Sequence, residues 1–219
     1  MKTIITTTKT ISIIFAVFQA MSLAAQSPDT IVLDPPDTSR GVPVMTALAN
    51  RASVRQFNPA PVRHKDLSDL VWAANGINRP GEDKRTAPSA LNAQDIDVYV
   101  WVESAFYLYN PGRHALDLVA EGDFRDMLAL SQDYVKEAPL VFLLVSDISR
   151  FSRGDDTQRL RNAAMDAAMV AQNILIFCAS EGFATVPRGI MDSQKIREAL
   201  NLTDSQYPML NVPVSYAID

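Results

Sequence analysis

The spacing of hydrophobic and polar positions divides the chain into helical and strand-like segments. Apolar residues recur at helical spacing in residues 44–51, 64–74 and 156–181. Two shorter helices are predicted for the charged residues 123–130 and for residues 193–200, which follow a cap at Asp192 or Ser193. The longest of them, from about Asp156 to Glu181, is rich in alanine, which permits close packing against another helix. Gly182 follows it at the position of a helix cap. This segment is therefore predicted to be the central helix.

Strand patterns occupy the remaining hydrophobic segments, residues 96–102, 106–109, 140–145 and 212–216. The first two are separated by Glu103-Ser104, which predicts a hairpin. Residues 140–145 form a continuous apolar run, typical of a strand buried on both faces. The chain therefore predicts an α+β fold, with about five helices around a small mixed sheet.

The first residues have the pattern of a secretory signal peptide. Lys2 and Lys9 precede an apolar run from Ile11 to Phe18, and small residues follow up to Ala25. We expect cleavage there and an exported, periplasmic protein; the alternative is an uncleaved helix that tethers the chain to a membrane. Residues 26–42 are rich in proline and predict an extended arm, which leaves residues 43–219 as one domain.

Composition and charge exclude several classes of protein. The 219 residues are 47% hydrophobic and 21% charged, which suits one sizeable core. The net charge of −5 argues against nucleic acid as the main ligand. One cysteine, Cys178, excludes an intramolecular disulfide, and its apolar neighbours favour a buried thiol over a nucleophile. His64 lies in a charged helix start and is interpreted as exposed, and no hydrolase or phosphate-loop motif is present.

Three polar stretches remain as candidates for a binding site. In residues 51–57, Arg51, Ser53 and Arg55 alternate, so in an extended segment their side chains would converge on one anion such as a phosphate. The alternative is that these arginines meet only solvent or local carboxylates. Residues 85–94 form a proline-containing polar loop suited to a planar heterocycle, and residues 181–190 leave a helix through Gly182 and Pro187. Each of the latter two stretches, taken alone, could be a plain loop.

In this order and spacing the three stretches resemble the FMN-dependent nitroreductase family, from about Leu33 onward. The resemblance implies that Arg51, Ser53 and Arg55 hold the FMN phosphate. It implies that the loop with Pro88, Ser89, Ala90 and Asn92 reaches the flavin of a partner chain. The segment containing Pro187, Arg188 and Gly189 would lie against the flavin ring, with Arg188 as a candidate for tuning its potential, and Gln132 would place an amide near the ring or ribityl chain.

The family resemblance also implies a fold and an activity. The fold is an α+β sandwich that forms an interlocked homodimer with FMN in the interface. The flavin would accept hydride from NAD(P)H or another donor and reduce a small electron-poor acceptor such as a nitroaromatic or a quinone. Two alternatives remain open: a non-catalytic protein that binds flavin or another planar ligand, and a specialised flavin desaturase or dehalogenase. Because the chain stops at Asp219 without a basic tail, we expect fewer cations at the phosphate than in many relatives.

Overall fold

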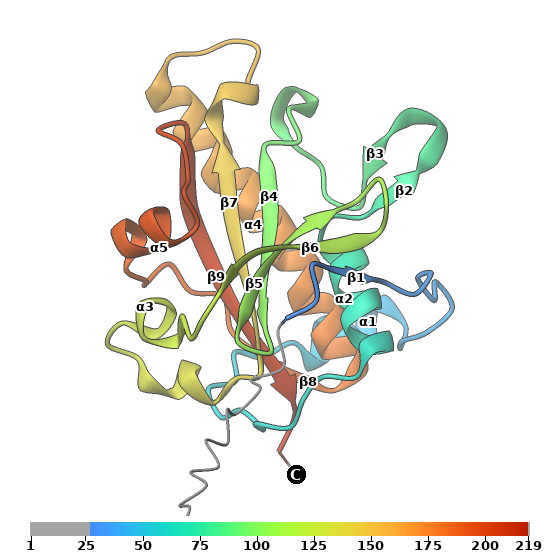
Figure 1. The fold of residues 1–219 in the computed structure, drawn as a ribbon. Helices are drawn as coiled ribbons and strands as arrows, with labels where there is room; N and C mark the ends of the chain where they lie inside the picture. Colours follow the sequence, from blue (N-terminus) through green and yellow to red (C-terminus); the bar gives the residue numbers. More distant parts are fainter. Residues whose placement is uncertain (1–26, 219) are drawn as a thin grey trace, which may run out of the picture.

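The computed structural model describes residues 27–218 and is built around one seven-stranded sheet (Figure 1). The signal peptide predicted for residues 1–25 lies outside the described residues. The strands follow the order β1-β6-β5-β4-β7-β9-β8. Their bounds are Thr30–Val32 (β1), Ile96–Val102 (β4), Ala105–Asn110 (β5), Ala115–Glu121 (β6), Leu140–Asp147 (β7), Phe183–Thr185 (β8) and Gln206–Tyr216 (β9). The α+β class is confirmed, but the pairings between these strands are antiparallel, so the expectation of a mixed sheet is wrong in that detail.

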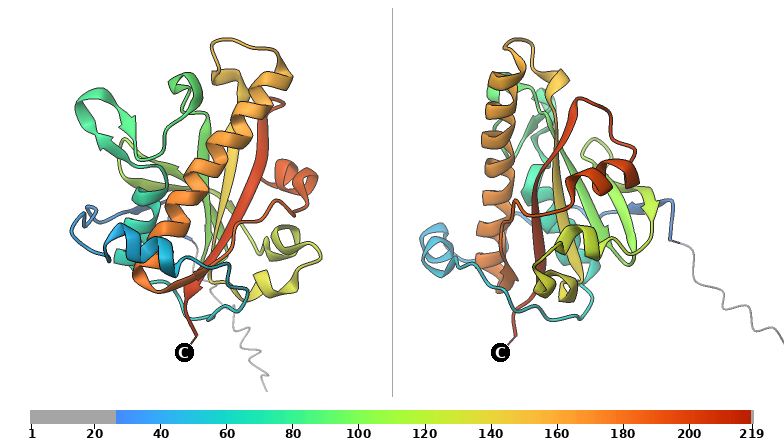
Figure 2. Two further views of the ribbon diagram at one scale, coloured as in Figure 1. Left: turned by 180° about the vertical axis from the view of Figure 1, so that it is seen from behind. Right: turned by 90° about the vertical axis from the view of Figure 1, so that its left-hand side faces the viewer.

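Helices cover both faces of the sheet (Figure 2). One face carries α2 (His64–Asn75) and the long α4 (Asp156–Glu181), against which α1 (Val44–Asn50) packs. The other face carries α3 (Arg125–Ala129), α5 (Ser193–Ala199) and the short helix η3 (Asp133–Glu137). The remaining elements are small: β2 (Ile77–Arg79), η1 (Pro80–Glu82), β3 (Lys84–Arg85), η2 (Ala90–Asn92) and η4 (Ile148–Arg150).

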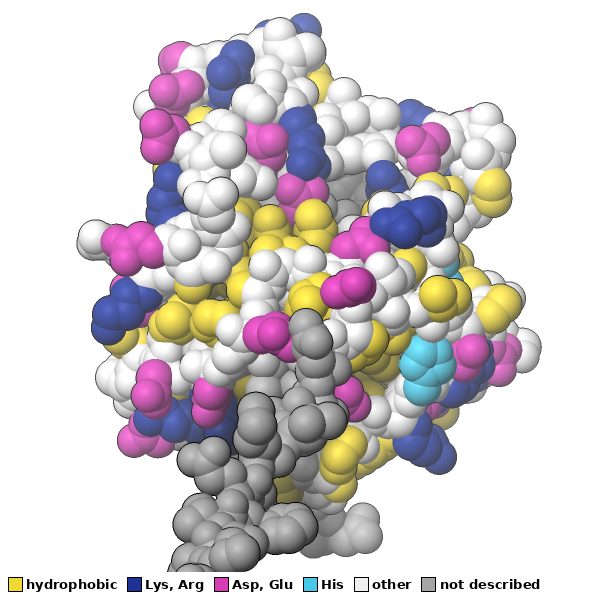
Figure 3. Space-filling model, viewed as in Figure 1, with side chains coloured by type: hydrophobic (Ala, Val, Ile, Leu, Met, Phe, Trp, Pro, Cys, Tyr) yellow, Lys and Arg dark blue, Asp and Glu magenta, His cyan; other side chains and the backbone are white. Residues whose placement is uncertain are grey.

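Strands β4 and β7 lie next to each other in the sheet and separate two hydrophobic cores. In β7, Leu140, Phe142 and Leu144 face the α2 and α4 side, whereas Val141, Leu143 and Val145 face the α3 and α5 side. The continuous apolar run of β7 is thus buried on both faces, as its sequence predicts, because side chains alternate along a strand. On the face drawn in Figure 3, hydrophobic side chains gather near the middle and charged ones lie mostly toward the periphery.

Helix α4 is defined by signals at both of its ends. Asp155 caps its start in a reciprocal pair with Gln158, and Gly182 ends it in a left-handed conformation with φ of 75°. Its inner face is buried against the sheet, whereas Met165 and Met169 on the outer face are 47% and 48% exposed. The helix is long and apolar enough to cross a membrane by composition, but its buried face packs in the core of this domain. An exposed apolar outer face is suited to packing against another surface.

The arm that precedes α1 is more structured than its sequence predicts. Residues 30–32 form β1, which pairs with β6 at the edge of the sheet. Within the arm β1 belongs to the sheet, whereas residues 33–43 form neither helix nor strand. A proline-rich sequence argues against a strand. A short edge strand is still possible there, because it needs backbone hydrogen bonds on one side only.

Candidate functional site

The segment that follows α1 presents its polar side chains to solvent. The Val54 amide donates to the carbonyl of Thr185 at 2.9 Å, which fastens the segment to β8. Val54 and Phe57 pack inward, on the core beneath α3 and α5. Ser53 and Arg55 are exposed and Arg51 is half-buried, and none of the three has a side-chain hydrogen bond or ion pair with another described residue. One alternative was that these arginines pair with local carboxylates. No such pair is present in the described part of the chain.

Residues 187–189 lie in the same region, one step beyond β8. The backbone of Arg188 bonds to Asn211 in both directions at 2.8 Å, which fixes this stretch on β9. Gly189 is exposed, and a Cβ placed on it would meet no atom within 4 Å. The backbone is thus open at Gly189, so a flat ring could approach it closely. Pro187 is half-buried beside it.

The Arg188 side chain has a role that the sequence does not reveal. Its guanidinium is 5% exposed and donates to the carbonyls of Leu128 and Ala129 at 2.9 and 3.0 Å. These carbonyls end α3, so Arg188 caps that helix, where the negative end of the helix dipole favours a cation. Burial lowers the pKa of Arg188 from its ordinary value. Because the guanidinium is engaged within the chain, its tuning of a flavin stays a prediction.

The side chain of Gln132 belongs to the same hydrogen-bond network. Its side-chain oxygen accepts from the Nε of Arg188 at 2.7 Å and from the hydroxyl of Tyr134 at 2.8 Å. Tyr134 in turn lies under the Arg188 guanidinium and stacks with Phe57. Only the NH₂ of Gln132 is left to contact a ligand, and the flavin contact implied for this residue is untested.

The loop with Pro88, Ser89, Ala90 and Asn92 has an unusual backbone. Leu91, Asn92 and Gln94 all have positive φ, at 58°, 54° and 48°. Non-glycine residues in this left-handed region are strained, and such strain gathers at functional sites. The loop is held by a bond from the Ala90 amide to Asp166 of α4 at 2.8 Å. Asn92 is exposed.

The two halves of the expected site lie at different levels of α4, the loop beside its N-terminal half and the arginine segment near its C-terminal end (Figures 1 and 2). The loop is attached at Asp166, whereas the chain just before α1 is attached at Ser180, through the Val42 amide at 2.8 Å. Fourteen positions separate these attachment points, which is about 21 Å along a helix axis. One chain therefore does not bring the loop to the arginine segment.

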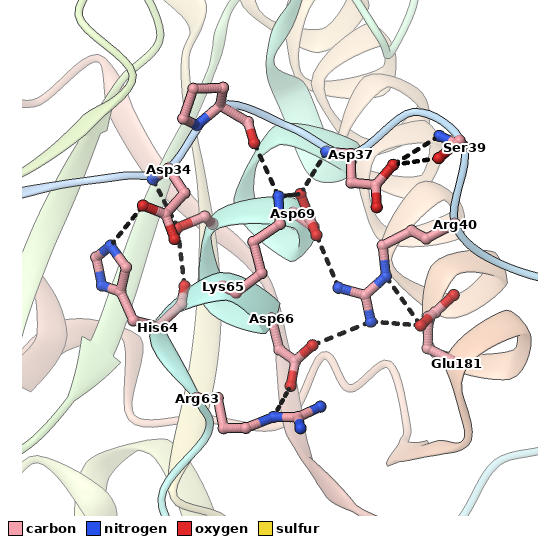
Figure 4. Close-up of polar contacts among 12 residues, drawn as sticks. Asp34, Asp37, Ser39, Arg40, Arg63, His64, Lys65, Asp66, Asp69 and Glu181 are labelled. Carbon is pink, nitrogen blue, oxygen red and sulfur yellow. Dashed lines mark hydrogen bonds and ion pairs between the residues drawn. The ribbon is translucent and has the colours of Figure 1, made fainter.

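Arg40 fixes the arm, and with it the start of α1, by an ion-pair cluster (Figure 4). Its guanidinium contacts Asp66 at 3.0 Å, Asp69 at 2.7 Å, and Glu181 at the end of α4. Burial alone would raise the pKa of Asp66, but bonds from Arg63, Tyr216 and Arg40 hold it below its ordinary value. The cluster therefore positions α1, whose last turn leads into Arg51.

Sequence reasoning missed two residues that build this region, Arg40 and Asp166. Arg40 lies in a segment without periodicity, so nothing in the sequence marks it. Asp166 did carry a signal, because it is an acidic residue on the buried stripe of an alanine-rich helix. His64, by contrast, is exposed and Cys178 is buried, as predicted.

Comparison with known proteins gives a consistent result. Residues 48–216 match the model of the nitroreductase family. A curated protein of Methanocaldococcus jannaschii, provisionally named a nitroreductase, is 30% identical over 200 residues, which covers 87% of this chain and 99% of that protein. A solved structure from Ralstonia eutropha JMP134, also provisionally a nitroreductase, is 35% identical with a TM-score of 0.82 and covers 88% of this chain and 91% of its own.

A more distant structure shares the fold. The NADPH:FMN oxidoreductase of Vibrio harveyi, solved with NAD⁺, has a TM-score of 0.61 at 18% identity, covering 80% of this chain and 69% of its own. The chain therefore belongs to the nitroreductase family and is a nitroreductase-like oxidoreductase.

Proposed function

We propose that the protein is a homodimeric FMN-dependent oxidoreductase whose two flavin sites are each assembled from both subunits. The observation that carries this proposal is the separation along α4 of the strained loop, attached at Asp166, from the arm before α1, attached at Ser180. If two copies pack α4 against α4 in antiparallel orientation, the loop of one copy comes to the arginine segment of the other. The exposed Met165 and Met169 supply an apolar surface for that contact.

The residues of the arginine segment fit the phosphate of FMN. Arg51 and Arg55 offer two guanidiniums without described carboxylate partners, and Ser53 adds a hydroxyl. A guanidinium forms bidentate, charge-assisted hydrogen bonds with phosphate oxygens. The last turn of α1 fixes the start of the segment, because the Arg51 amide bonds to Ala47 at 2.9 Å. The Arg51 and Arg55 side chains therefore extend from a segment whose start is fixed by this hydrogen bond.

The other residues fit the ring. Gly189 leaves its backbone open to a planar group, and the loop with Ser89 and Asn92 supplies polar groups from the partner subunit. When bound, the flavin supplies the redox chemistry, taking hydride from NAD(P)H or another donor and passing electrons to a small electron-poor acceptor. The chain's own residues bind and orient it, which agrees with the absence of a nucleophile motif in the sequence. A nitroaromatic or a quinone is the acceptor class that we propose.

Export to the periplasm is part of the same proposal. It rests on the signal-peptide pattern of residues 1–25. Mass spectrometry of protein from the periplasmic fraction tests it, with a mature N-terminus at or near Gln26 as the expected result. Recovery of full-length chain from the cytoplasm or the membrane would contradict it.

Absorbance spectroscopy combined with size-exclusion chromatography tests the proposed function. We expect a yellow dimer that retains or takes up one FMN per subunit and is bleached by NADH or NADPH without oxygen. A nitroaromatic or a quinone should then restore the oxidised spectrum. A dimer that binds FMN but is bleached by no donor would be the non-catalytic alternative, and a colourless monomer in excess FMN would contradict the proposal.

A further inference from the structure

Two carboxyl groups lie beneath the strained loop of residues 88–94 and take no part in the proposed flavin contacts. Asp95 comes just before β4 and is 0% exposed; Asp166, on the inner face of α4, is 6% exposed. A buried carboxylate is costly unless it is paired or hydrogen-bonded. Neither residue has an ion pair with a described lysine or arginine. Ion pairs therefore do not explain how two carboxylates can be buried here.

The hydrogen bonds of the pair leave one oxygen without a donor. Ser146 of β7 donates its hydroxyl to Oδ2 of Asp95, and the Ala90 amide donates to Oδ2 of Asp166 at 2.8 Å. Oδ1 of Asp95 is buried and has no partner among the described residues. Asp166 lies close enough to Asp95 to raise the pKa of that carboxyl group. A proton on Oδ1 of Asp95 would supply the missing interaction, because a protonated carboxyl donates to a carboxylate.

The surroundings favour that proton. Burial first, and the neighbouring Asp166 as well, raise the pKa of Asp95 to about 7, although the Ser146 bond acts in the opposite direction. Two cations lie nearby. Arg150 of η4 pairs with Asp97 and Asp147. Arg85 of β3 donates from its Nε to the Gln94 side chain, and its Nη1 is buried without a partner among the described residues. The apolar residues Ile148, Phe151 and Ala163 close the rest of the site around Ala90.

The loop depends on its anchors, because its backbone is strained. Leu91, Asn92 and Gln94 are all left-handed, a conformation that persists only where surrounding contacts impose it. Asp166 is the only side chain of α4 that bonds to the loop backbone among the described residues. Arg150 holds the far end, through the carbonyl of Gln94 at 3.0 Å. Losing the Asp166 contact would free the first half of the loop.

We propose that Asp95 and Asp166 share a single proton and that this protonated pair positions the Pro88–Asn92 loop. Its effect on flavin binding rests on the proposed function, whereas its effect on the loop does not. When the proton leaves, two buried negative charges repel each other, and Asp166 moves away from the Ala90 amide. The loop is then ordered at lower pH and loosened as the pH rises through neutrality.

The decisive experiment compares the wild type with Asp95→Asn by amide hydrogen exchange at Ala90, corrected for the intrinsic pH dependence. The asparagine amide donates to Asp166 at every pH, so it imitates the protonated form. We expect wild-type protection at Ala90 to fall at least tenfold between about pH 6 and about pH 8.5, whereas the variant keeps it. Asp117→Asn, at a half-buried position of β6, removes the same charge elsewhere and should follow the wild type.

A second measurement needs no variant. Infrared difference spectroscopy of the wild type should show a protonated carboxyl band at neutral pH that disappears over the same pH range and is missing in Asp95→Asn. The absence of this band at neutral pH, or an equal loss of Ala90 protection in both proteins, would overturn the proposal. If FMN binds but its affinity has the same pH dependence in both proteins, the effect on the flavin is refuted while the proposed function stands. If FMN does not bind at all, the proposed function fails and the exchange data still test the pair.

Discussion

The amide of Val54 donates a hydrogen bond of 2.9 Å to the carbonyl oxygen of Thr185. This bond joins the segment that carries Arg51, Ser53 and Arg55 to the strand that leads into Gly189. The phosphate-binding and ring-binding parts of the proposed site are thus neighbours within one subunit. In the proposed dimer, the loop of residues 88–92 comes from the partner subunit.

Removing either arginine of this segment should weaken FMN binding. A hydrogen bond to a charged group contributes about 1.5–3 kcal/mol, so Arg51→Ala or Arg55→Ala should each raise the Kd for FMN about tenfold to a hundredfold. Quenching of flavin fluorescence on binding provides the measurement. Arg79→Ala, an exposed arginine on β2, is the matched control and should leave the Kd unchanged. Equal affinities in all four proteins would refute the phosphate role.

Arg40→Ala should destabilise the fold, because it leaves the buried Asp66 and Asp69 without their shared cation. Because Asp66 keeps Arg63 and Asp69 keeps Lys65, the loss should be smaller than the roughly 3–5 kcal/mol of an uncompensated buried charge, and urea unfolding measures it. Arg113→Ala removes an exposed ion pair with Asp117 and should cost less than about 1 kcal/mol. Because the folded-state pKa of Asp66 is lowered, its contribution is present above its unfolded pKa and is lost as the pH falls through the lower folded value. The difference between wild type and Arg40→Ala should therefore shrink in acid.

Arg188→Met should destabilise the region of α3 more than it alters flavin chemistry directly. The substitution leaves the carbonyls of Leu128 and Ala129 and the side chain of Asn211 without their donor. Each unsatisfied buried group costs about 1–3 kcal/mol, so we expect a loss of at least about 3 kcal/mol in urea unfolding. If stability is unchanged but the flavin potential shifts, the side chain acts on the cofactor and the capping role is wrong.

Cys178 should be unreactive in the folded protein. Burial raises the pKa of its thiol well above the ordinary value, and the thiolate is the reactive form. A colorimetric thiol reagent should therefore label it only after denaturation, at one thiol per chain. Rapid labelling of the native protein at neutral pH would show that the α4 core opens.

Local sequence patterns predicted the fully buried elements. The bounds of the other elements depend on tertiary contacts. The apolar run of β7 and the cap at Gly182 follow from residues in one stretch of chain. Strand β9 is longer than its predicted part, residues 212–216, because Pro208 enters the sheet where the register shifts between Leu144 and Val145. A proline in the sequence argues against a strand unless such a bulge is known.

The sequence predicted which residue types form the candidate site, but not how these residues are arranged in space. The arginine segment and the loop each have a recognisable sequence, yet their separation along α4 depends on where the arm before α1 and the loop attach to that helix. Asp95 and Asp166 meet only because β4 and α4 lie on each other, so no spacing in the sequence relates them. The capping of α3 by Arg188 has the same origin.

A mixed-dimer experiment tests most directly whether each flavin site is made by two subunits. One chain carries Arg51→Ala and Arg55→Ala, and the other carries Asn92→Asp, which keeps a residue tolerant of positive φ but removes an amide donor. Each pure variant should bind FMN weakly at both sites. In the purified heterodimer, one site combines both defects and the other is intact, so we predict one tightly bound FMN per dimer. A heterodimer that binds no FMN more tightly than its parents would contradict the shared site.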